Sequence, residues 1–343
     1  MSGVLTVPVR DGEGGQRLDR WLKRRFPKLT QGAIEKMCRR GELRVDGGRC
    51  KANTRVEDGQ QVRVPPLPDA PDADRKPRPR LAERDVELMR SLVVYEDDHV
   101  IALNKPAGLA VQGGSGQARH VDGMAAALQG SREDPPRLVH RLDKDTSGLL
   151  LLARDRRTAA SLAEAFRTRE TRKIYWAVVA GTPSPRMGTV RFGLVKAGGS
   201  DERMRAVHPR EVDATEGAKR ATSDYAVLDD LGGRAAWVAL VPVTGRTHQL
   251  RVHMAEMGHP IVGDGKYGGR GQENLGDGWG AMLGGEISRK LHLHARHLSL
   301  THPATGRRLH LTAPLPEHMA RTWDMLGWRA EDVPADPFED ADD

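Results

Sequence analysis

The densest group of ionisable side chains lies in the segment His140–Asp145, directly before the apolar run Leu149–Leu152. Collecting so many charges at the mouth of a buried strand is costly for folding alone, so this segment is a candidate functional loop. A tight turn in which Asp and Ser side chains cap a strand is the structural alternative. The candidate side chains are those of His140, Arg141, Asp143, Lys144 and Asp145.

One chemistry that this spacing could support is phosphoryl transfer. Asp143-Lys144-Asp145-Thr146 fits a D-x-D-x-T pattern, in which the first Asp is phosphorylated in the presence of Mg²⁺. That motif should follow a hydrophobic strand, whereas His140-Arg141 precede it here. The sequence therefore disfavours this interpretation, and an activity independent of Mg²⁺ would exclude it.

A second candidate, Tyr175, lies near the start of a predicted strand. Residues 173–179 alternate between two faces, and Tyr175 shares a face with Ala177 and Val179. At this position the tyrosine can present its ring and hydroxyl to a cleft, or it can be a half-buried core residue.

A third candidate group lies in Thr244–Gly258, which predicts a helix capped by Thr247 and ended by Gly258. Helical spacing places apolar side chains on one face and Arg251 on the other. We therefore expect Arg251 to face solvent or a ligand. The apolar face consists of Leu250, Met254 and Met257, and the opposite face of His248, Arg251 and Ala255.

Other motifs do not predict a metal or nucleotide site. Four histidines near the C-terminus alternate with leucines, as in a half-exposed strand. The run Gly113–Gly116 is followed by no Gly-Lys-Ser/Thr, so it is not a phosphate-binding P-loop. Cys38 and Cys50 are too few for a disulfide framework and lack zinc-site spacing, which favours a reducing compartment. The four histidines are His292, His294, His297 and His302.

The 343 residues suggest two domains. Six prolines in residues 65–79 predict a linker. We assign 1–64 to a first domain, 65–85 to the linker, 86–330 to a second domain and 331–343 to a disordered tail, because the tail has seven acidic residues and no basic one. No stretch has the length and apolarity of a membrane span, and we expect a cytoplasmic monomer.

The first domain is strongly basic. It predicts a helix from Leu18 to Phe26, a helix capped by Thr30 and ended by Gly41, and a hairpin of strands 43–46 and 49–52 turning at Gly47-Gly48. Residues 16–64 hold 14 basic and 6 acidic residues, whereas the whole chain has a net charge of +7. Such clustering favours a polyanion-binding surface over a merely solvated face. Candidate contacts are Arg24, Arg25, Lys36, Arg39 and Arg40.

The second domain predicts more strands than helices, without βαβ regularity. We expect an α+β fold with a mixed, mainly antiparallel sheet. Strands are predicted near 92–95, 99–103, 149–152, 174–179 and 237–243, and helices near 86–90, after Asp155, and at 316–326. The glycine-rich segments 193–220 and 268–287 are expected to be surface loops outside the core.

Several of these segments together resemble a known family. HRLDKDTSGLLLLAR, NKPAGLAVQGGSG, KIYWAVVAG, GRTHQLRVHMAEMGHPIVGDGKYG and LHLHARHLSLTHPATG occur in the order typical of RluA-type pseudouridine synthases, over about 230 residues. RLDRWLKRRFPKLTQGAIEKMCRRGELRVDGG resembles the helix–helix–hairpin core of S4 RNA-binding domains. The combination is similar to the large-subunit ribosomal RNA branch of the family, and GGSG at 113–116 most resembles its RluC subgroup.

The resemblance implies an isomerase that converts uridines to pseudouridine in large-subunit ribosomal RNA without a cofactor. It places the catalytic aspartate at Asp143, the active-site tyrosine at Tyr175 and the active-site arginine at Arg251. Arg141 matches a position that can engage RNA around the flipped nucleotide, and His140 and His248 are further candidate RNA contacts. Gln112 departs from the pattern, which has a His before GGSG.

Two other functions stay open beside this one. A tRNA substrate fits the basic domain equally well, because phosphate contacts position RNA without reading its sequence. A non-catalytic RNA-binding or ribosome-assembly protein is the alternative from another class, and the presence of Asp143, Tyr175 and Arg251 argues against it.

Overall fold

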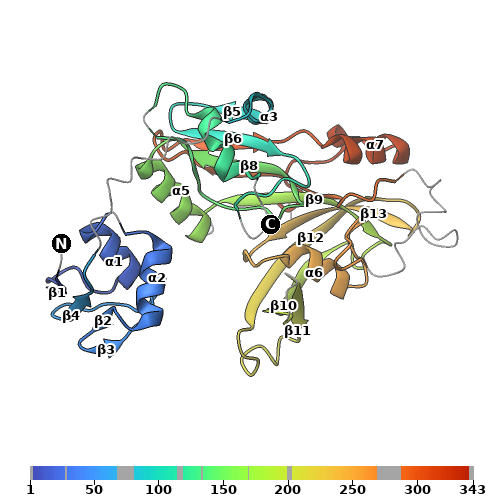
Figure 1. Ribbon diagram of the computed structural model, residues 1–343. Helices are drawn as coiled ribbons and strands as arrows, with labels where there is room; N and C mark the ends of the chain where they lie inside the picture. Colours follow the sequence, from blue (N-terminus) through green and yellow to red (C-terminus); the bar gives the residue numbers. More distant parts are fainter. Residues whose placement is uncertain are drawn as a thin grey trace. The chain divides into compact units, whose positions relative to one another are not determined.

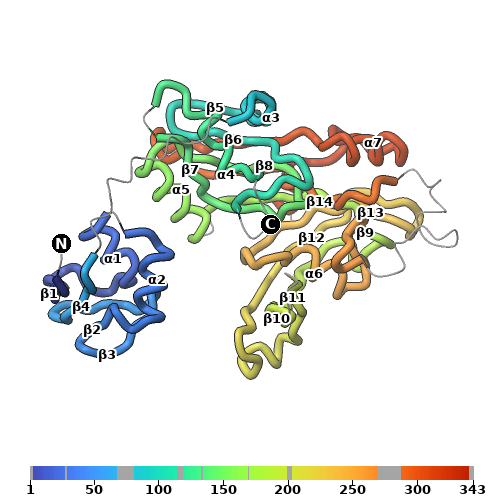
Figure 2. The backbone as a smooth tube through the Cα atoms, in the orientation of Figure 1, coloured from blue at the N-terminus to red at the C-terminus, as the bar shows by residue number. Residues whose placement is uncertain are grey.

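The structure is a computed structural model that describes residues 3–27, 29–67, 81–113, 119–132, 134–168, 170–198, 203–268 and 287–339. The chain divides into an N-terminal unit, Met1–Arg80, and a large unit, Leu81–Asp343. Both are drawn in Figure 1, and Figure 2 traces their backbone. None of the helices in the described residues has the length and apolarity that a bilayer crossing requires.

Two helices of the N-terminal unit form where the sequence predicts them. They are α1 (Leu18–Arg25) and α2 (Gln31–Arg40). The Thr30 hydroxyl accepts a hydrogen bond from the Ala33 N–H (3.2 Å), and Gly41 ends α2 in the left-handed conformation with φ 69°. Both predicted ends of α2 are therefore confirmed.

The sheet of this unit is larger than the predicted hairpin. Its four strands are ordered β1 (Leu5–Pro8), β4 (Gln61–Val64), β2 (Arg44–Val45) and β3 (Gly48–Arg49). The predicted turn at Gly47-Gly48 was one residue late, because Asp46 and Gly47 adopt the positive φ angles of 48° and 77°. This pair forms the tight hairpin turn that glycine and aspartate favour.

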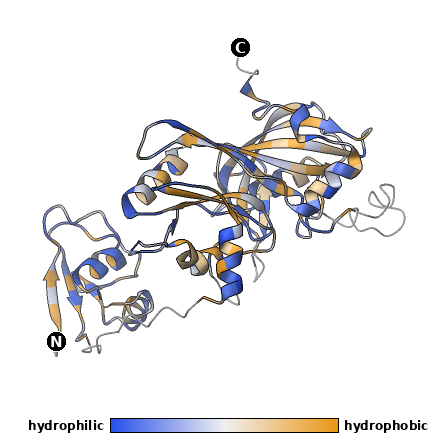
Figure 3. Cartoon of the chain, turned by 90° about the horizontal axis from the view of Figure 1, so that it is seen from above, coloured by the Kyte–Doolittle hydropathy of each residue, from blue (hydrophilic) through white to orange (hydrophobic). Residues whose placement is uncertain are grey.

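Within its described residues, the large unit is built on one sheet of eleven strands. Nine follow the order β11-β10-β12-β13-β9-β14-β8-β6-β5, while β15 pairs with β14 and β7 with β8. Of these pairings, β8 with β14 is parallel and the others are antiparallel. The expected mixed, mainly antiparallel α+β fold is confirmed, and Figure 3 shows its central strands to be largely hydrophobic. The strands are β5 (Val93–Glu96), β6 (Val100–Lys105), β7 (Arg137–Leu138), β8 (Ser147–Ala153), β9 (Arg172–Ala180), β10 (Met187–Lys196), β11 (Met204–Val207), β12 (Lys219–Asp230), β13 (Ala235–Pro242), β14 (Leu293–Thr301) and β15 (Arg308–Thr312).

Two helices of the large unit begin or end at the residues that the sequence predicts. The Asp155 carboxylate accepts a hydrogen bond from the Thr158 N–H (2.8 Å) at the predicted start of α5. Gly327 ends α7 in the left-handed conformation, so this helix also lies where it was predicted. The helices are α3 (Glu83–Ser91), α4 (Val121–Met124), α5 (Arg156–Thr168), α6 (Gln249–Glu256) and α7 (Glu317–Leu326), with 3-10 turns at Ala125–Leu128 and Ala330–Asp332.

The parallel pair β8–β14 joins segments far apart in sequence. The Ser147 hydroxyl lies 2.9 Å from His294 Nδ1, and both side chains are fully buried. Gly148 has φ 109°, and a Cβ there would lie 2.3 Å from the Ala295 carbonyl oxygen. Only glycine fits this close approach. The start of β8, which follows the candidate loop, is therefore held against β14.

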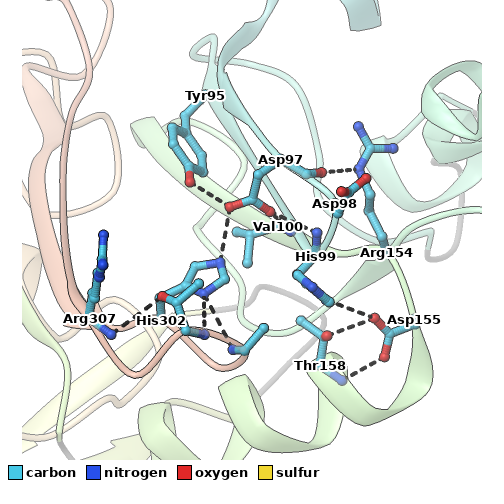
Figure 4. A network of polar contacts seen from close by, with 12 residues as sticks. Tyr95, Asp97, Asp98, His99, Val100, Arg154, Asp155, Thr158, His302 and Arg307 are labelled. Carbon is cyan, nitrogen blue, oxygen red and sulfur yellow. Dashed lines mark hydrogen bonds and ion pairs between the residues drawn. The ribbon is translucent and has the colours of Figure 1, made fainter.

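A polar network fixes the turn between β5 and β6 (Figure 4). The Asp97 carboxylate accepts hydrogen bonds from the Tyr95 hydroxyl and the Val100 N–H, and it lies 3.0 Å from His302 Nε2. Arg154 Nε donates to the Asp97 carbonyl (2.7 Å). These contacts join the β5–β6 turn to the segments that follow β8 and β14.

The structure corrects the prediction that residues 193–220 form a surface loop. This segment holds the end of β10, all of β11 and the start of β12, and Leu194, Val207 and Val212 are buried. Its glycine-rich composition hid strands that pair with their neighbours in sequence, as in the β10–β11 hairpin, where Lys196 is paired with Met204. Residues 269–286, nearly all of the second predicted loop, lie outside the described residues.

The proposed boundaries of the linker and tail also differ from the structure. Helix α3 begins at Glu83, inside the predicted linker, of which residues 68–80 lie outside the described part. The prediction of a disordered tail was wrong for 331–339. Asp336 forms a two-bond ion pair with Arg172 (2.6 and 2.9 Å), and Phe338 packs against the tryptophan-rich core.

We predict that Gly148→Ala destabilises the large unit by about 3 kcal/mol or more, because its Cβ would overlap the β14 backbone. Urea unfolding followed by far-ultraviolet circular dichroism measures the change. Gly198→Ala is the control, since nothing lies within 4 Å of the added Cβ there. Equal stability of the two variants would contradict the assigned close approach.

We also predict that Asp336→Asn lowers the free energy of unfolding by about 1–2 kcal/mol at neutral pH. Burial raises the pKa of Asp336, but hydrogen bonds from Arg172 and the Phe338 N–H outweigh it, so the pKa is lowered. The stabilisation by the carboxylate is therefore present at neutral pH and lost as the pH falls through this lowered pKa. The free energies of unfolding of the wild type and Asp336→Asn should therefore become equal in acid. Asp324→Asn, at an exposed position, is the control.

Candidate active site

The loop that carries Asp143 lies between β7 and β8 and is held by backbone hydrogen bonds. The Thr146 N–H donates to the Asp143 carbonyl (3.2 Å), and the Gly108 N–H donates to the Lys144 carbonyl (2.9 Å). Asp143 is partly accessible, with 28% of its side chain exposed. The loop is therefore fixed by backbone hydrogen bonds and keeps the Asp143 carboxylate partly exposed to solvent.

The sequence analysis missed Lys105, whose side chain supports this loop. Its side chain is completely buried at the end of β6, and its Nζ donates to the carbonyls of Pro106, Leu109 and Lys144, each at 2.9 Å. Burial lowers the pKa of Lys105 to about 7, although the negative charges of Asp145 and Asp143 act to raise it. In the sequence, Lys105 is part of the NKPAG turn, and nothing in that motif predicts that its side chain is buried.

Helix α6 positions Arg251 differently from the prediction. His248, and not Thr247, occupies the N-cap position, with φ 53° and no capping bond from its side chain. Arg251 and His248 are 3% and 7% exposed, so neither faces solvent. The prediction failed because strands β10, β11, β12 and β13 contact the helix and bury nearly its whole circumference.

Arg251 holds two carboxylates at different distances. Its Nε and Nη2 each donate to Asp264 at 2.7 Å, while its Nη1 lies 3.9 Å from Asp143 Oδ2. Burial opposes the charge, but the hydrogen bonds and charge of Asp264, with the charge of Asp143, raise the pKa of Arg251. The sequence analysis missed Asp264, although it lies in the family-like segment GHPIVGDGKYG.

His248 and Tyr267 complete the surroundings of Asp143. His248 Nε2 lies 3.9 Å from Asp143 Oδ2, and its Nδ1 lies 2.8 Å from the Tyr267 hydroxyl. The ring of Tyr267 also faces the Arg251 guanidinium, whose central carbon is 5.2 Å from the ring centroid. Tyr267 was not among the sequence candidates.

The pairing of strands in the sheet places Tyr175 of β9 near the same site. Ala295 of β14 is paired with Tyr175 on one side and with Gly148 of β8 on the other. The half-buried Tyr175 packs between two core clusters. Burial, and then the charge of Asp143, raise the pKa of its hydroxyl, which keeps the phenol neutral. The structure therefore brings together Asp143, Tyr175 and Arg251.

The two residues before Asp143 have different environments. Arg141 is exposed, and its Nη1 lies 3.4 Å from Gln112 Oε1. His140 instead points inward: its Nε2 accepts the Leu151 N–H (2.9 Å) and its ring stacks on Phe166. Burial, and then the charge of Lys173, lower the pKa of His140 to about 3, so a cationic RNA contact at His140 does not fit the structure.

The basic candidates of the N-terminal unit are mostly free to meet solvent. Arg24, Lys36, Arg39 and Arg40 are exposed on α1 and α2. Arg25 differs, because it pairs with Glu13 (2.7 Å) and lies over the Trp21 ring. Its guanidinium is engaged within the unit and is a weaker candidate for RNA contact.

The C-terminal histidines are structural bridges. His292 and His294 are fully buried, so the expectation of a half-exposed strand was wrong on this face. His292 contacts the Lys290 carbonyl and the Thr322 hydroxyl, and His294 contacts Ser147 and the Ala313 carbonyl. Burial lowers the pKa of each to about 3. Within the described residues, no group of three or more His, Cys, Asp or Glu side chains could hold a metal ion.

Asp143 is thus a carboxylate that lies near two side-chain nitrogens and beside a neutral tyrosine. Such a group can act as a nucleophile or as a general base towards a substrate that reaches the loop. The tyrosine ring offers a flat surface on which a base can stack.

Comparisons with known proteins agree with this geometry. Residues 99–256 match the family model described as RNA pseudouridylate synthase, and residues 16–62 match the S4 domain. "Ribosomal large subunit pseudouridine synthase C" of Escherichia coli K12 is 36% identical over 328 residues, which cover 94% of this chain and 97% of the relative. The protein of the same name from Vibrio cholerae is 35% identical over 92% of this chain and 95% of its own.

Solved structures show the same relationship. The human "RNA Pseudouridylate Synthase Domain Containing 4" protein has a TM-score of 0.58 and 33% identity, and the match covers 71% of this chain and 97% of that one. The human "Domain Containing 1" protein has a TM-score of 0.51 and 26% identity, covering 65% and 83%. The chain therefore belongs to the RNA pseudouridylate synthase family and is an RNA pseudouridine synthase with an S4 domain.

Proposed function

We propose that this protein converts specific uridines of large-subunit ribosomal RNA to pseudouridine, with Asp143 acting on the ribose of a flipped-out uridine. The relatives that span nearly the whole chain are named for this substrate. The observation that carries the mechanism is the position of the Asp143 carboxylate, with Arg251 Nη1 and His248 Nε2 both 3.9 Å from Oδ2. With such a substrate, we expect the reaction to take place in the cytoplasm.

The reaction exchanges one glycosidic bond for another. The C1′–N1 bond of uridine breaks, the uracil rotates, and a C1′–C5 bond forms. C5 then loses its proton and N1 gains one, so that no net redox change occurs. The uridine must leave its stack first, at a cost of a few kcal/mol that is recovered by contacts in the pocket.

The site residues fit these steps in order. The exposed Arg141 lies on the same loop as Asp143 and is placed to contact RNA around the flipped nucleotide. Tyr175 is the stacking platform, and its hydroxyl stays neutral. Asp143 either attacks C1′ as a nucleophile or removes the C2′ proton as a base. In both routes the carboxylate acts in its ionised form, and Arg251 Nη1 lies 3.9 Å from its Oδ2.

We predict that Asp143→Asn binds RNA within about twofold of the wild type but loses pseudouridine formation by about a thousandfold or more, as expected when the reacting group is removed. Tritium release from uridine labelled at C5 measures the rate. Asp145→Asn is the matched control, because Asp145 is exposed on the same loop and should retain activity. Appreciable turnover by Asp143→Asn would remove Asp143 from its role.

The substrate is tested by offering large-subunit rRNA, small-subunit rRNA and tRNA transcripts to the purified protein and mapping pseudouridines chemically. We expect modification of the large-subunit RNA at specific sites. Modification of tRNA alone would overturn this substrate in favour of tRNA. Tight RNA binding without any modification would favour the non-catalytic RNA-binding alternative.

The buried ion pair yields a further prediction. Asp264→Asn leaves the Arg251 charge without its close partner, so we expect a loss of about 3–5 kcal/mol of stability together with a fall in kcat. Asp213→Asn breaks an exposed pair with Arg220 (2.5 Å) and should cost less than about 1 kcal/mol. Chemical denaturation of both variants gives the comparison, and similar losses would show that Asp264 carries no special role.

A further inference from the structure

Tyr267 connects the outer hairpin β10–β11 to the candidate active site through its hydroxyl. Its oxygen accepts a hydrogen bond from the Met204 N–H at the start of β11 (2.8 Å) and lies 2.8 Å from His248 Nδ1. The Met204 N–H can only donate. The tyrosine oxygen therefore acts as an acceptor toward β11, and its own proton is available for His248.

This arrangement allows the Tyr267 hydroxyl to select which nitrogen of His248 carries the proton. Burial lowers the pKa of His248, and Arg251 and Lys266 lower it too, while Asp143 and Asp264 raise it. A neutral imidazole has one N–H and one acceptor nitrogen. If the Tyr267 hydroxyl donates to Nδ1, the imidazole proton lies on Nε2, which faces Asp143.

Asp143 Oδ2 is the carboxylate oxygen for which contacts with both His248 and Arg251 are found. Both His248 Nε2 and Arg251 Nη1 lie 3.9 Å from Oδ2. These distances are longer than hydrogen bonds, and such contacts often tighten when substrate binds. Because both contacts involve Oδ2, we assign the other oxygen, Oδ1, to the ribose.

The backbone at His248 shows that this orientation is held against local preference. His248 has φ 53°, one of two positive values among the described non-glycine residues, the other being Asp46 in a hairpin turn. A left-handed conformation at such a residue costs of order 1 kcal/mol and persists where surrounding contacts hold it. Here the hydroxyl of Tyr267 supplies one of those contacts.

We propose that Tyr267 is a positioning residue for pseudouridine formation. Its hydroxyl holds His248 in the Nε2-protonated tautomer, so that a neutral N–H donor joins Arg251 in fixing Asp143 Oδ2 and directing Oδ1 to the substrate. This proposal rests on the proposed function of Asp143. It assigns a role in the reaction to Tyr267 and a specific tautomer to His248.

The tautomer is measured without substrate. Protein labelled with ¹⁵N-histidine gives distinct two-bond proton–nitrogen patterns for the two neutral tautomers, and His248→Gln identifies the signal. We expect the Nε2–H pattern in the wild type and a mixture in Tyr267→Phe, which keeps the ring over Arg251 and loses the hydroxyl. An Nδ1–H pattern in the wild type would overturn the proposal.

Kinetics then test the effect on the reaction. We expect Tyr267→Phe to lower kcat about tenfold while KM and RNA affinity change less than twofold. Tyr225→Phe is the control, because it removes a tyrosine hydroxyl whose hydrogen bond, to the Pro185 carbonyl (2.9 Å), involves no site residue. Tyr267→Phe removes the contacts with both His248 and the Met204 N–H. If the kcat values of the two variants agree within twofold, the positioning role is wrong.

A double-mutant comparison separates positioning from simple loss of stability. If Tyr267 acts through His248, His248→Ala combined with Tyr267→Phe should be no slower than His248→Ala alone. His248→Gln, which restores an N–H donor, should regain part of the lost kcat. Fully additive losses would contradict the proposal.

The outcomes distinguish this inference from the proposed function. A wild-type protein that modifies only tRNA would overturn the rRNA substrate, and the same kinetic comparison would then be made on tRNA. An inactive wild type would overturn the enzymatic function and, with it, the positioning role, whereas the histidine tautomer would remain a separate result.

Discussion

The buried pair between Arg251 and Asp264 is the interaction on which the site depends. A guanidinium that is 3% exposed needs close acceptors, and the two oxygens of Asp264 take Nε and Nη2 at 2.7 Å. The planar fork then has a fixed direction, and its remaining nitrogen, Nη1, faces Asp143. A lysine could not divide its donors in this fixed geometry. Asp264 thus orients the cation, whose remaining nitrogen lies 3.9 Å from the Asp143 carboxylate.

The sheet supplies the frame in which this pair meets its target. Asp143 precedes β8, Tyr175 lies on β9, and β14 separates these strands. Ala295 of β14 pairs with both Gly148 and Tyr175, so a single row across three strands sets the spacing between the loop and the tyrosine. The absent side chain of Gly148 permits the close approach, and the Ser147–His294 contact maintains it. Residues more than a hundred positions apart are therefore held by backbone register.

The sequence predicted features that depend on local signals. Thr30 and Gly41 bound α2, Asp155 starts α5, and strand alternation located Tyr175. The errors share a different cause. Arg251 was expected to face solvent or a ligand, and the structure excludes solvent because strands bury the side of α6 that helical periodicity predicted to be outward. Asp264 and Tyr267 were missed because their importance comes from partners that lie 13 and 19 positions away along the chain.

The buried cations of the candidate active site and the exposed cations of the N-terminal unit have different partners. In the site, Arg251 is compensated by Asp264 and Lys105 is surrounded by carbonyls, so these buried cations have little capacity left for phosphates. The exposed cations of α1 and α2, by contrast, remain open to a polyanion. Such phosphate contacts raise affinity without reading sequence. In the function that we propose, the choice of uridine must then depend on RNA shape and on contacts around the flipped base, which we assign to Arg141 and Tyr175.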